Sequence, residues 1–589
     1  MDAAQVPVLR EIKHRLQRIA GTGLFLGALV AVGATLRLSL ITGQRFHGDE
    51  AIYGYWARLV ASGRDPLLLS VPLDKPPLFI YLLAGVFKLF SPTEVAARLI
   101  NEVASVTAVI LTYRLGRRFY GEPEALLAAG VMALSPFNLL FAPTTFTDPL
   151  MVALSLAAVT MAAAGRWGWA GIIAGLAVAT KQQGILFVPL VVATRWIAGQ
   201  RGRDDFSGPE RQIVTSRTWD MIKAGLGFLS VMLLLTGWDA LRWQRRASFW
   251  EQSAISHGPL HLVSWWELGE RLAGWSELLA YIFGSPLLNA ILLLGVPLLL
   301  WRSRGTVLVS NDEATAILGS TGEAPSRPFS NLTSPARADW LLASFSSVFF
   351  LVHWLFSFSV WDRYLLGLVP MVSLLLARVV WRGTGWILHW ADRVGFSRLW
   401  PEVRPKTIAR QDLYPSIGPG RLSDSLDGRA LKKFGWAGLM VIVLLAAPGA
   451  GAVWKSYPIG GDHGVYQGLE ETIAFFRHEV PAGSAVWHRY LGWHYLYYLF
   501  DAPLDLRWYA DPAALAAKVS RDAETLSYVA FPAWEREAES KMRAALGATG
   551  YRLLPQRRVW REDGSHAFTI YRIVSTDTKL GVTWLPENQ

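Results

Sequence analysis

Long apolar runs separated by short charged segments dominate residues 21–453. Runs of this kind predict membrane-crossing helices. We expect eleven of them, at residues 21–41, 96–115, 125–142, 150–164, 169–180, 184–197, 221–241, 278–301, 340–358, 364–380 and 436–453. A further apolar run, at residues 77–90, has the length of a re-entrant or interfacial segment rather than of a crossing helix.

Basic residues next to these runs predict their orientation, because Lys and Arg favour the cytoplasmic side of a membrane. Arg10, Lys13, Arg15 and Arg18 precede the first run, which places the N-terminus in the cytoplasm. The charges that follow later runs agree only if residues 77–90 do not cross. Eleven crossings then place the C-terminal part outside. The sequence therefore predicts a multi-pass protein of the cell inner (cytoplasmic) membrane.

Composition supports this class of protein. Of 589 residues, 52% are hydrophobic and 17% are charged, and the mean hydropathy is +0.27. An average soluble domain carries about a quarter charged residues. The net charge of +11 does not indicate nucleic-acid binding, since Lys and Arg are spread among the loops that flank apolar runs. The absence of cysteine from the sequence excludes disulfides, thiolate metal sites and cysteine nucleophiles.

The fold class we predict is mainly α: a transmembrane domain followed by a small extracytoplasmic α/β domain. The first spans residues 1–455, with an outer catalytic loop at 43–77, a cytoplasmic insert at 303–338 that is rich in Ser, Gly and Pro, and a cytoplasmic linker at 381–433. The second spans residues 456–589. Its periodicity predicts helices at 468–480 and 534–550, and strands at 484–488, 504–509 and 526–531. Its aromatic residues 487–500 either pack in a core, bind a sugar or contact the membrane domain.

Four charged residues stand out in the first outer loop: Asp49, Glu50, Asp74 and Lys75. A charge at bilayer depth costs about 2.5 to 3.5 kcal/mol, so this cluster belongs at a wet membrane surface or in a polar cavity.

Each candidate residue also has a purely structural explanation. Asp49 and Glu50 can be the acidic first turn of an amphipathic helix, where carboxylates favour the positive end of the helix dipole. Asp148, before Pro149, is typical of a helix start. Lys75 and Lys181 can anchor helix ends at the interface, and Arg363 can be neutralised by the adjacent Asp362.

The common location of the candidates favours a functional explanation. The predicted topology places six residues on the outer face although none was used to orient the chain: Asp49, Glu50, Lys75, Asp148, Lys181 and Arg363. Carboxylates beside cations at the headgroup level suit transfer from an anionic lipid-linked donor. A carboxylate can deprotonate an acceptor, and cations can stabilise a departing phosphate.

These motifs resemble the GT-C integral-membrane glycosyltransferases. The strongest are the Asp49-Glu50 pair and the stretch from Asp74-Lys75-Pro76-Pro77 to Leu78. The other similar stretches are Ala97-Arg98-Leu99, Thr147-Asp148-Pro149 and Arg363-Tyr364-Leu365-Leu366 followed by Pro370. The chain is most similar, over about residues 21–370, to bacterial relatives of the protein O-mannosyltransferases and of the lipid A aminoarabinose transferases.

The resemblance implies an inverting transfer of a sugar from a polyprenyl phosphate to a lipid, glycan or protein acceptor on the outer face of the membrane. By motif position, Asp49 is the catalytic carboxylate, and Glu50 and Asp148 orient the acceptor or the base. Lys75 binds the donor phosphate. Arg58, Lys181 and Arg363 match the phosphate-binding positions more loosely.

One position differs from both related families. Ile52 stands where the aminoarabinose transferases have Arg and the mannosyltransferases have His, so the donor sugar and the acceptor class stay open. Two other functions also stay open: a membrane transporter and a non-catalytic protein that binds lipid-linked sugars. We expect no cofactor and no metal, because the lysines can neutralise the carboxylates that would otherwise hold a divalent ion. The expected partners are the polyprenyl-phosphate sugar donor, the acceptor and membrane lipids.

Overall fold

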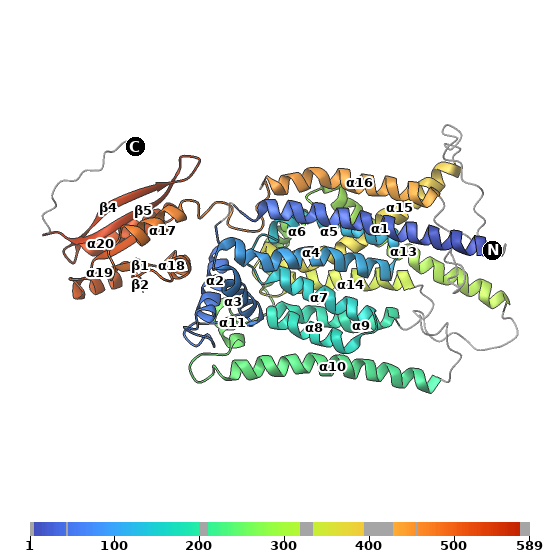
Figure 1. Cartoon of the computed structure of the whole chain (residues 1–589), viewed down its shortest axis with the longest axis horizontal. Helices are drawn as coiled ribbons and strands as arrows, with labels where there is room; N and C mark the ends of the chain where they lie inside the picture. Colours follow the sequence, from blue (N-terminus) through green and yellow to red (C-terminus); the bar gives the residue numbers. More distant parts are fainter. Residues whose placement is uncertain are drawn as a thin grey trace.

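Along the sequence, the first part of the chain is helical, and a mixed α/β region begins with the first strand at Ala485 (Figure 1). The computed structural model describes residues 5–42, 45–198, 210–317, 334–393, 428–454 and 456–577. The helical part comprises α1 (Gln5–Leu40), α2 (Gly48–Ala61), α3 (Leu78–Phe90), α4 (Glu94–Phe119), α5 (Glu122–Leu134), α6 (Pro136–Phe141), α7 (Asp148–Ala163), α8 (Trp167–Thr180), η1 (Gln182–Phe187), α9 (Val188–Ala198), α10 (Glu210–Ala240), α11 (Phe249–His257), η2 (Trp265–Glu267), α12 (Leu268–Ala280), α13 (Pro286–Ile317), α14 (Ser334–Leu355), η3 (Asp362–Leu368), α15 (Val369–Arg393) and α16 (Gly428–Val453).

Several of these helices can cross a membrane. Among the described residues, five segments are long and apolar enough: Glu94–Phe119, Thr218–Ala240, Pro286–Ser303, Pro335–Leu355 and Asp362–Ile387. Shorter apolar helices accompany them, so the protein is a multi-pass membrane protein, while the count of eleven crossings and the sidedness of the termini stay predictions. In Figure 1 the long helices run side by side, and α2, α3 and α11 gather at the end nearest the C-terminal sheet.

Two expected crossings are interrupted. Residues 125–142 are divided between α5 and α6, with Ser135 between them. We expected a span at residues 278–301, but α12 ends at Ala280 and α13 begins at Pro286. Gly284 lies between them with a φ of 60°, and Pro286 fits the first position of a new helix, where its missing N–H is not needed. The chain therefore turns where we predicted a continuous helix.

Helices occupy both ends of the expected insert and of the expected linker. The backbone of α13 continues to Ile317 and α14 begins at Ser334, so both ends of the 303–338 insert are helical. Likewise, α15 continues to Arg393 and α16 begins at Gly428, which makes both ends of the 381–433 linker helical. The middle parts of the two segments lie outside the described residues.

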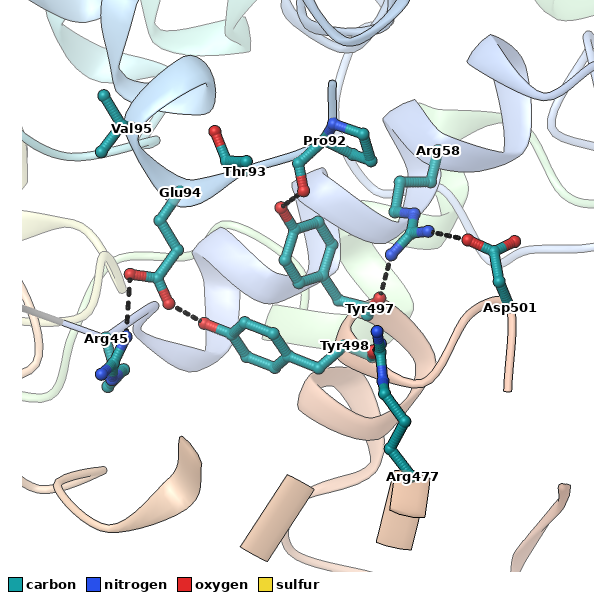
Figure 2. A pocket seen from close by; sticks show the side chains of 10 residues that line it. All are labelled: Arg45, Arg58, Pro92, Thr93, Glu94, Val95, Arg477, Tyr497, Tyr498 and Asp501. Carbon is teal, nitrogen blue, oxygen red and sulfur yellow. Dashed lines mark hydrogen bonds and ion pairs between the residues drawn. The ribbon is translucent and has the colours of Figure 1, made fainter. Parts of the chain in front are cut away.

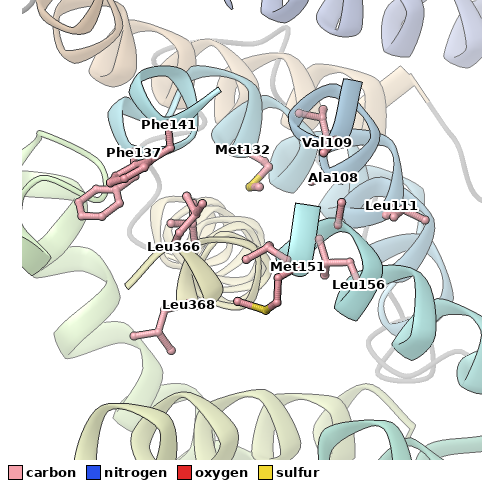
Figure 3. Close-up of a cluster of buried hydrophobic side chains, with 14 of the residues drawn as sticks. Ala108, Val109, Leu111, Met132, Phe137, Phe141, Met151, Leu156, Leu366 and Leu368 are labelled. Carbon is pink, nitrogen blue, oxygen red and sulfur yellow. The ribbon is translucent and has the colours of Figure 1, made fainter. Parts of the chain in front are cut away.

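Close packing holds the bundle together, since lipid provides no hydrophobic force between helices. In Figure 3, apolar side chains of α4, α5, α6, α7 and η3 converge, and the rings of Phe137 and Phe141 stack at a centroid distance of 5.6 Å. Glycine permits the tightest approach, between α8 and α10: a Cβ at Gly171 would lie 1.9 Å from the carbonyl oxygen of Ala224. The segment Asp362–Ile387 is the most enclosed of the five, with 89% of its most apolar window buried.

The C-terminal region is a five-stranded sheet with helices on both faces. The strands are β1 (Ala485–His488), β2 (Asp505–Trp508), β3 (Ser527–Pro532), β4 (Tyr551–Trp560) and β5 (His566–Ser575), in the order β2-β1-β3-β5-β4. The first three pair in parallel, and β5 pairs antiparallel with β3 and β4. The helices are α17 (Leu469–His478), α18 (Gly492–Tyr498), α19 (Pro512–Arg521) and α20 (Arg536–Gly547).

Alternation along the strands explains the two faces, because successive side chains of a strand point to opposite sides. Val486 packs with α17 and α18, whereas its neighbours Ala485 and Trp487 pack with α19 and α20. The three predicted strands and both predicted helices are present. The β4–β5 hairpin was not predicted, although Asp563-Gly564 between the two strands is a turn signal. The division into two domains stays a prediction.

Candidate active site

The N-terminus of α2 carries the two predicted acidic residues, and they point to different partners. Glu50 closes a capping box: its Oε2 accepts the His47 backbone N–H at 2.8 Å, and its Oε1 accepts the Thr145 N–H at 2.5 Å. With 1% of its surface exposed, Glu50 ties α2 to the segment before α7. Burial raises the pKa of Glu50 to about 7, although Arg98 and the two backbone N–H groups act in the opposite direction.

Asp49 forms an ion pair with Arg363, whose Nη1 lies 2.5 Å from Asp49 Oδ2. The Asp49 side chain is 30% exposed and that of Arg363 is 9% exposed. Burial alone would raise the pKa of Asp49, but Arg363, His47 and Lys75 together lower it below its usual value. Asp49 is therefore an ionised, partly exposed carboxylate. It is held by Arg363, which lies at the start of η3.

Asp148 and Lys181 form a second ion pair, with Lys181 Nζ 2.6 Å from Asp148 Oδ1. Both side chains are buried, at 2% and 5% exposure. Thr147 takes the N-cap position of α7, so the Asp148 carboxylate faces Lys181 instead of capping its own helix as the structural explanation assumed. The Lys181 ammonium also lies over the Tyr364 ring, 4.4 Å from its centroid, which brings α7, the start of η1 and η3 together.

Lys75 and Asp74 form the third pair, with Lys75 Nζ 2.6 Å from Asp74 Oδ2. The Asp74 carbonyl accepts a hydrogen bond from Gln182 Nε2 at 2.8 Å, so the loop before α3 is fastened to η1 directly beside Lys181. His257 of α11 approaches the same carboxylate, with Nδ1 3.9 Å from Asp74 Oδ2.

The three pairs share one neighbourhood. Asp49, Asp74 and Asp148 add to the effect of burial in raising the pKa of the Tyr53 hydroxyl, and Arg363 lowers it. Lys181 lies within electrostatic reach of both Arg363 and Lys75. The structure thus brings together Asp49, Asp148, Lys75, Lys181 and Arg363. Three carboxylates neutralise three cations, an arrangement that an incoming anion can enter by competing for the cations.

Comparisons with known proteins identify families that the chain resembles. The family model described as dolichyl-phosphate-mannose-protein mannosyltransferase matches residues 74–207, a segment that contains Lys75, Asp148 and Lys181. Undecaprenyl phosphate-alpha-4-amino-4-deoxy-L-arabinose arabinosyl transferase 1 from Pseudomonas fluorescens (strain Pf0-1) is 24% identical over 296 residues. That match spans 47% of this chain and about half, 49%, of the relative.

Solved structures extend the likeness to nearly the whole chain. The crystal structure of ArnT from Cupriavidus metallidurans in the apo state superposes with a TM-score of 0.58 at 14% identity, covering 94% of this chain and 98% of ArnT. ArnT bound to undecaprenyl phosphate gives a TM-score of 0.54 at 15% identity over the same shares. The chain is similar to the GT-C glycosyltransferases. The resemblance predicted from the motifs is confirmed.

Arg58 lies apart from the three ion pairs. It follows Asp49 by nine residues on α2, which is two and a half helical turns, so the two side chains project from opposite faces. Figure 2 shows its guanidinium bound to the Tyr497 carbonyl and to Asp501. These groups line a pocket of about 450 Å³ between α2 and the C-terminal region. A phosphate-binding role for Arg58 beside Asp49 therefore receives no support from its position.

The sequence did not indicate a role for several residues in or beside the three ion pairs. Asp74 was quoted within the Asp-Lys-Pro-Pro motif, yet its pairing with Lys75 was not predicted. His47 precedes α2 and Tyr53 lies on it, so the two residues are on either side of Asp49 in the sequence. The helical periodicity of this segment could have indicated that Tyr53 points inward. Gln182 follows Lys181 directly, and no role was predicted for it. Their importance depends on contacts between distant segments.

The described residues contain no group of three or more His, Cys, Asp or Glu side chains arranged to hold a metal ion. The expectation that the enzyme needs no metal or cofactor stays a prediction. The aromatic residues 487–500 are divided between two of the alternatives: Tyr495 lies in the core of the C-terminal region, whereas Tyr497 packs with Phe46 and Phe87 of the helical bundle.

Proposed function

We propose that this protein transfers a sugar from a polyprenyl-phosphate-linked donor to a lipid, glycan or protein acceptor at the outer face of the cytoplasmic membrane. The observation that carries the proposal is the meeting of three adjacent ion pairs: Asp49 with Arg363, Asp74 with Lys75, and Asp148 with Lys181. ArnT, which has the same fold, has been crystallised bound to undecaprenyl phosphate, which supports a polyprenyl phosphate as the lipid part of the donor.

The three cations suit the donor phosphate. Lys75, Lys181 and Arg363 come from three separate segments and share one neighbourhood, so they can surround an anionic group. Preorganised cations that face developing negative charge stabilise a transition state strongly in a site from which water is largely excluded. Because each cation is paired with a carboxylate, the cations are neutralised when no donor is bound. A phosphate binds by displacing the carboxylates from the cations.

Asp49 is the best placed base for the acceptor. It has the most exposed side chain of the three paired carboxylates, at 30% against 17% for Asp74 and 2% for Asp148. A phosphate that binds Arg363 weakens the hold of Arg363 on Asp49. The pKa of Asp49 then rises from its lowered value toward its usual one, which makes it a stronger base only once the donor is present.

The reaction follows from these two roles. Asp49 takes the proton of the acceptor nucleophile, which attacks the anomeric carbon from the side opposite the phosphate. The bond between that carbon and the phosphate oxygen breaks, and the electron pair leaves with the polyprenyl phosphate, which the three cations stabilise. Direct displacement of this kind inverts the anomeric centre. Asp148 holds Lys181 in place, and Glu50 fixes the start of α2.

The test uses purified protein in lipid nanodiscs with a radiolabelled sugar on polyprenyl phosphate and acceptors extracted from the cell envelope. Transfer of label with release of polyprenyl phosphate supports the proposal. Binding of the donor without any transfer, under every acceptor extract, would indicate the non-catalytic binding protein. Movement of label across the membrane without bond cleavage would indicate the transporter.

A further inference from the structure

The segment between α16 and α17 turns sharply several times and packs against the helical bundle, unlike an extended linker. We call residues 457–468 the connector. Five of them adopt positive φ angles: Gly460, Gly461, His463, Gly464 and Gly468. Such a run of left-handed residues winds the chain sharply, and glycine supplies most of it without steric cost. Ile459 is fully buried in the core of the helical bundle.

The connector contacts the arginine side of the Asp49–Arg363 pair. The Gly460 backbone N–H donates to Asp362 Oδ2 at 2.8 Å, and the other oxygen of Asp362 accepts the Arg363 backbone N–H at 2.7 Å. Gly460 sits so close to α6 that a Cβ there would lie 2.8 Å from the Leu140 carbonyl oxygen. The start of η3, and with it Arg363, is therefore fixed from the connector.

The connector also contacts the aspartate side of the same pair. The Tyr466 ring lies edge-on to His47, at 6.5 Å between centroids, and His47 is the N-cap of the helix that carries Asp49. Tyr466 in turn packs on His494 of α18 at 4.3 Å, and His494 Nε2 lies 2.9 Å from the Phe46 carbonyl oxygen. Buried Asp462 accepts the Tyr466 backbone N–H and shapes this turn.

We propose that the connector is a positioning element for transfer: Gly460 and Tyr466 hold the Asp49 carboxylate and the Arg363 guanidinium in register from two sides. The inference rests on the proposed function, because it assigns a role in that reaction to residues that touch neither substrate. It gives the C-terminal region an indirect role in transfer, since Tyr466 of the connector packs against His47 and His494 of α18 contacts Phe46, both in the loop before α2.

The chain offers a matched pair of variants. Gly460→Ala and Gly464→Ala place a Cβ on residues with similar φ angles, 70° and 79°, so both carry backbone strain. A Cβ at Gly460 meets the Leu140 backbone, whereas a Cβ at Gly464 enters space that the described residues leave open. Gly460→Ala should lower kcat for transfer about 100-fold, the effect of a misplacement of about 1 Å, while donor affinity changes less than threefold. Gly464→Ala should keep kcat.

A pH profile separates positioning from a general loss of structure. Arg363, His47 and Lys75 are the charged groups that hold the pKa of Asp49 down. Loosening the contact with Arg363 in Gly460→Ala should move the acid limb of the kcat/KM profile to higher pH, because that profile reports the enzyme before the donor displaces Arg363 from Asp49. Tyr466→Leu should act in the same direction, and Tyr466→Phe, which keeps the ring against His47, should restore wild-type kcat, so the proposal is testable even if Gly460→Ala fails to fold.

The outcomes distinguish this inference from the proposed function. If Asp49→Asn abolishes transfer while Gly460→Ala and Tyr466→Leu keep wild-type kcat and pH profile, the connector has no positioning role and the function stands. If Gly460→Ala and Tyr466→Leu lower only the amount of folded protein, and kcat per folded molecule is unchanged, the connector contributes only to stability. If Asp49→Asn itself transfers normally, the proposed function fails first.

Discussion

The buried pair of Asp148 and Lys181 separates stability from function most clearly. Lys181→Met removes the ammonium and leaves the Asp148 carboxylate, which is 2% exposed, without its partner at 2.6 Å. Removing one member of a buried ion pair destabilises a protein by about 3 to 5 kcal/mol, because an uncompensated charge stays buried. Asp148→Asn removes this charge, and replacement of a whole buried ion pair by uncharged groups often changes stability little.

We therefore expect a double-mutant cycle with opposite readouts. In thermal unfolding in nanodiscs, Lys181→Met should be strongly destabilised, and the Asp148→Asn/Lys181→Met double variant should recover most of the loss. In the donor-binding and transfer assays the double variant should stay defective, since no cation is restored beside the phosphate. Lys541→Met, which breaks the exposed pair with Glu537, serves as the control and should change neither readout. Recovery of both stability and transfer in the double variant would show that the pair is only structural.

Three further predictions use other parts of the structure. Lys75→Ala should weaken binding of a short-chain polyprenyl phosphate about 10- to 100-fold, as expected for one lost charge-assisted contact, whereas Arg58→Gln on the opposite face of α2 should not; equal affinities for Lys75→Ala and wild type would remove Lys75 from the site. Burial raises the pKa of Glu50 from 4.5 to about 7, so its contribution to stability is full below pH 4.5 and is lost as the pH rises to about 7. Unfolding should therefore show a loss of about 3 kcal/mol over this range that Glu50→Gln lacks, and a parallel pH dependence in both proteins would contradict the assignment. A reporter fused after residue 589 should be external and one inserted after residue 313 cytoplasmic; the same side for both would refute the predicted topology.

Local signals predicted most of the secondary structure, and long-range contacts account for what was missed. Apolar runs predicted most of the long helices of the bundle, because a membrane helix can be recognised from its apolar composition. The start of α13 at Pro286 was missed, although Gly284-Ser285-Pro286 is a local turn signal within the apolar run. The β4 strand was missed because its charged residues hide the alternation that its buried residues Leu553 and Val559 would otherwise show.

The candidate site was predictable as a set of residues but not as a set of pairs. The common outer face could be inferred from topology, and the helix period already implied that Arg58 and Asp49 point apart. Nothing in the sequence indicated that Arg363 would pair with Asp49, 314 positions away, rather than with its neighbour Asp362. Asp362 instead accepts backbone N–H groups from Arg363 and Gly460, which leaves the guanidinium for Asp49.

The turnover of Asp49→Asn tests the central claim most directly. The amide keeps the shape of the side chain and deletes its basicity, and general-base catalysis typically contributes about 100- to 10,000-fold. We predict that sugar transfer from the polyprenyl-phosphate donor falls by this factor while donor affinity is kept or slightly improved, because the variant removes a competitor of the phosphate for Arg363. Inactivity of Asp148→Asn with near-normal Asp49→Asn would pass the role of base to Asp148. Turnover within threefold of wild type in Asp49→Asn, Glu50→Gln and Asp148→Asn would contradict the account.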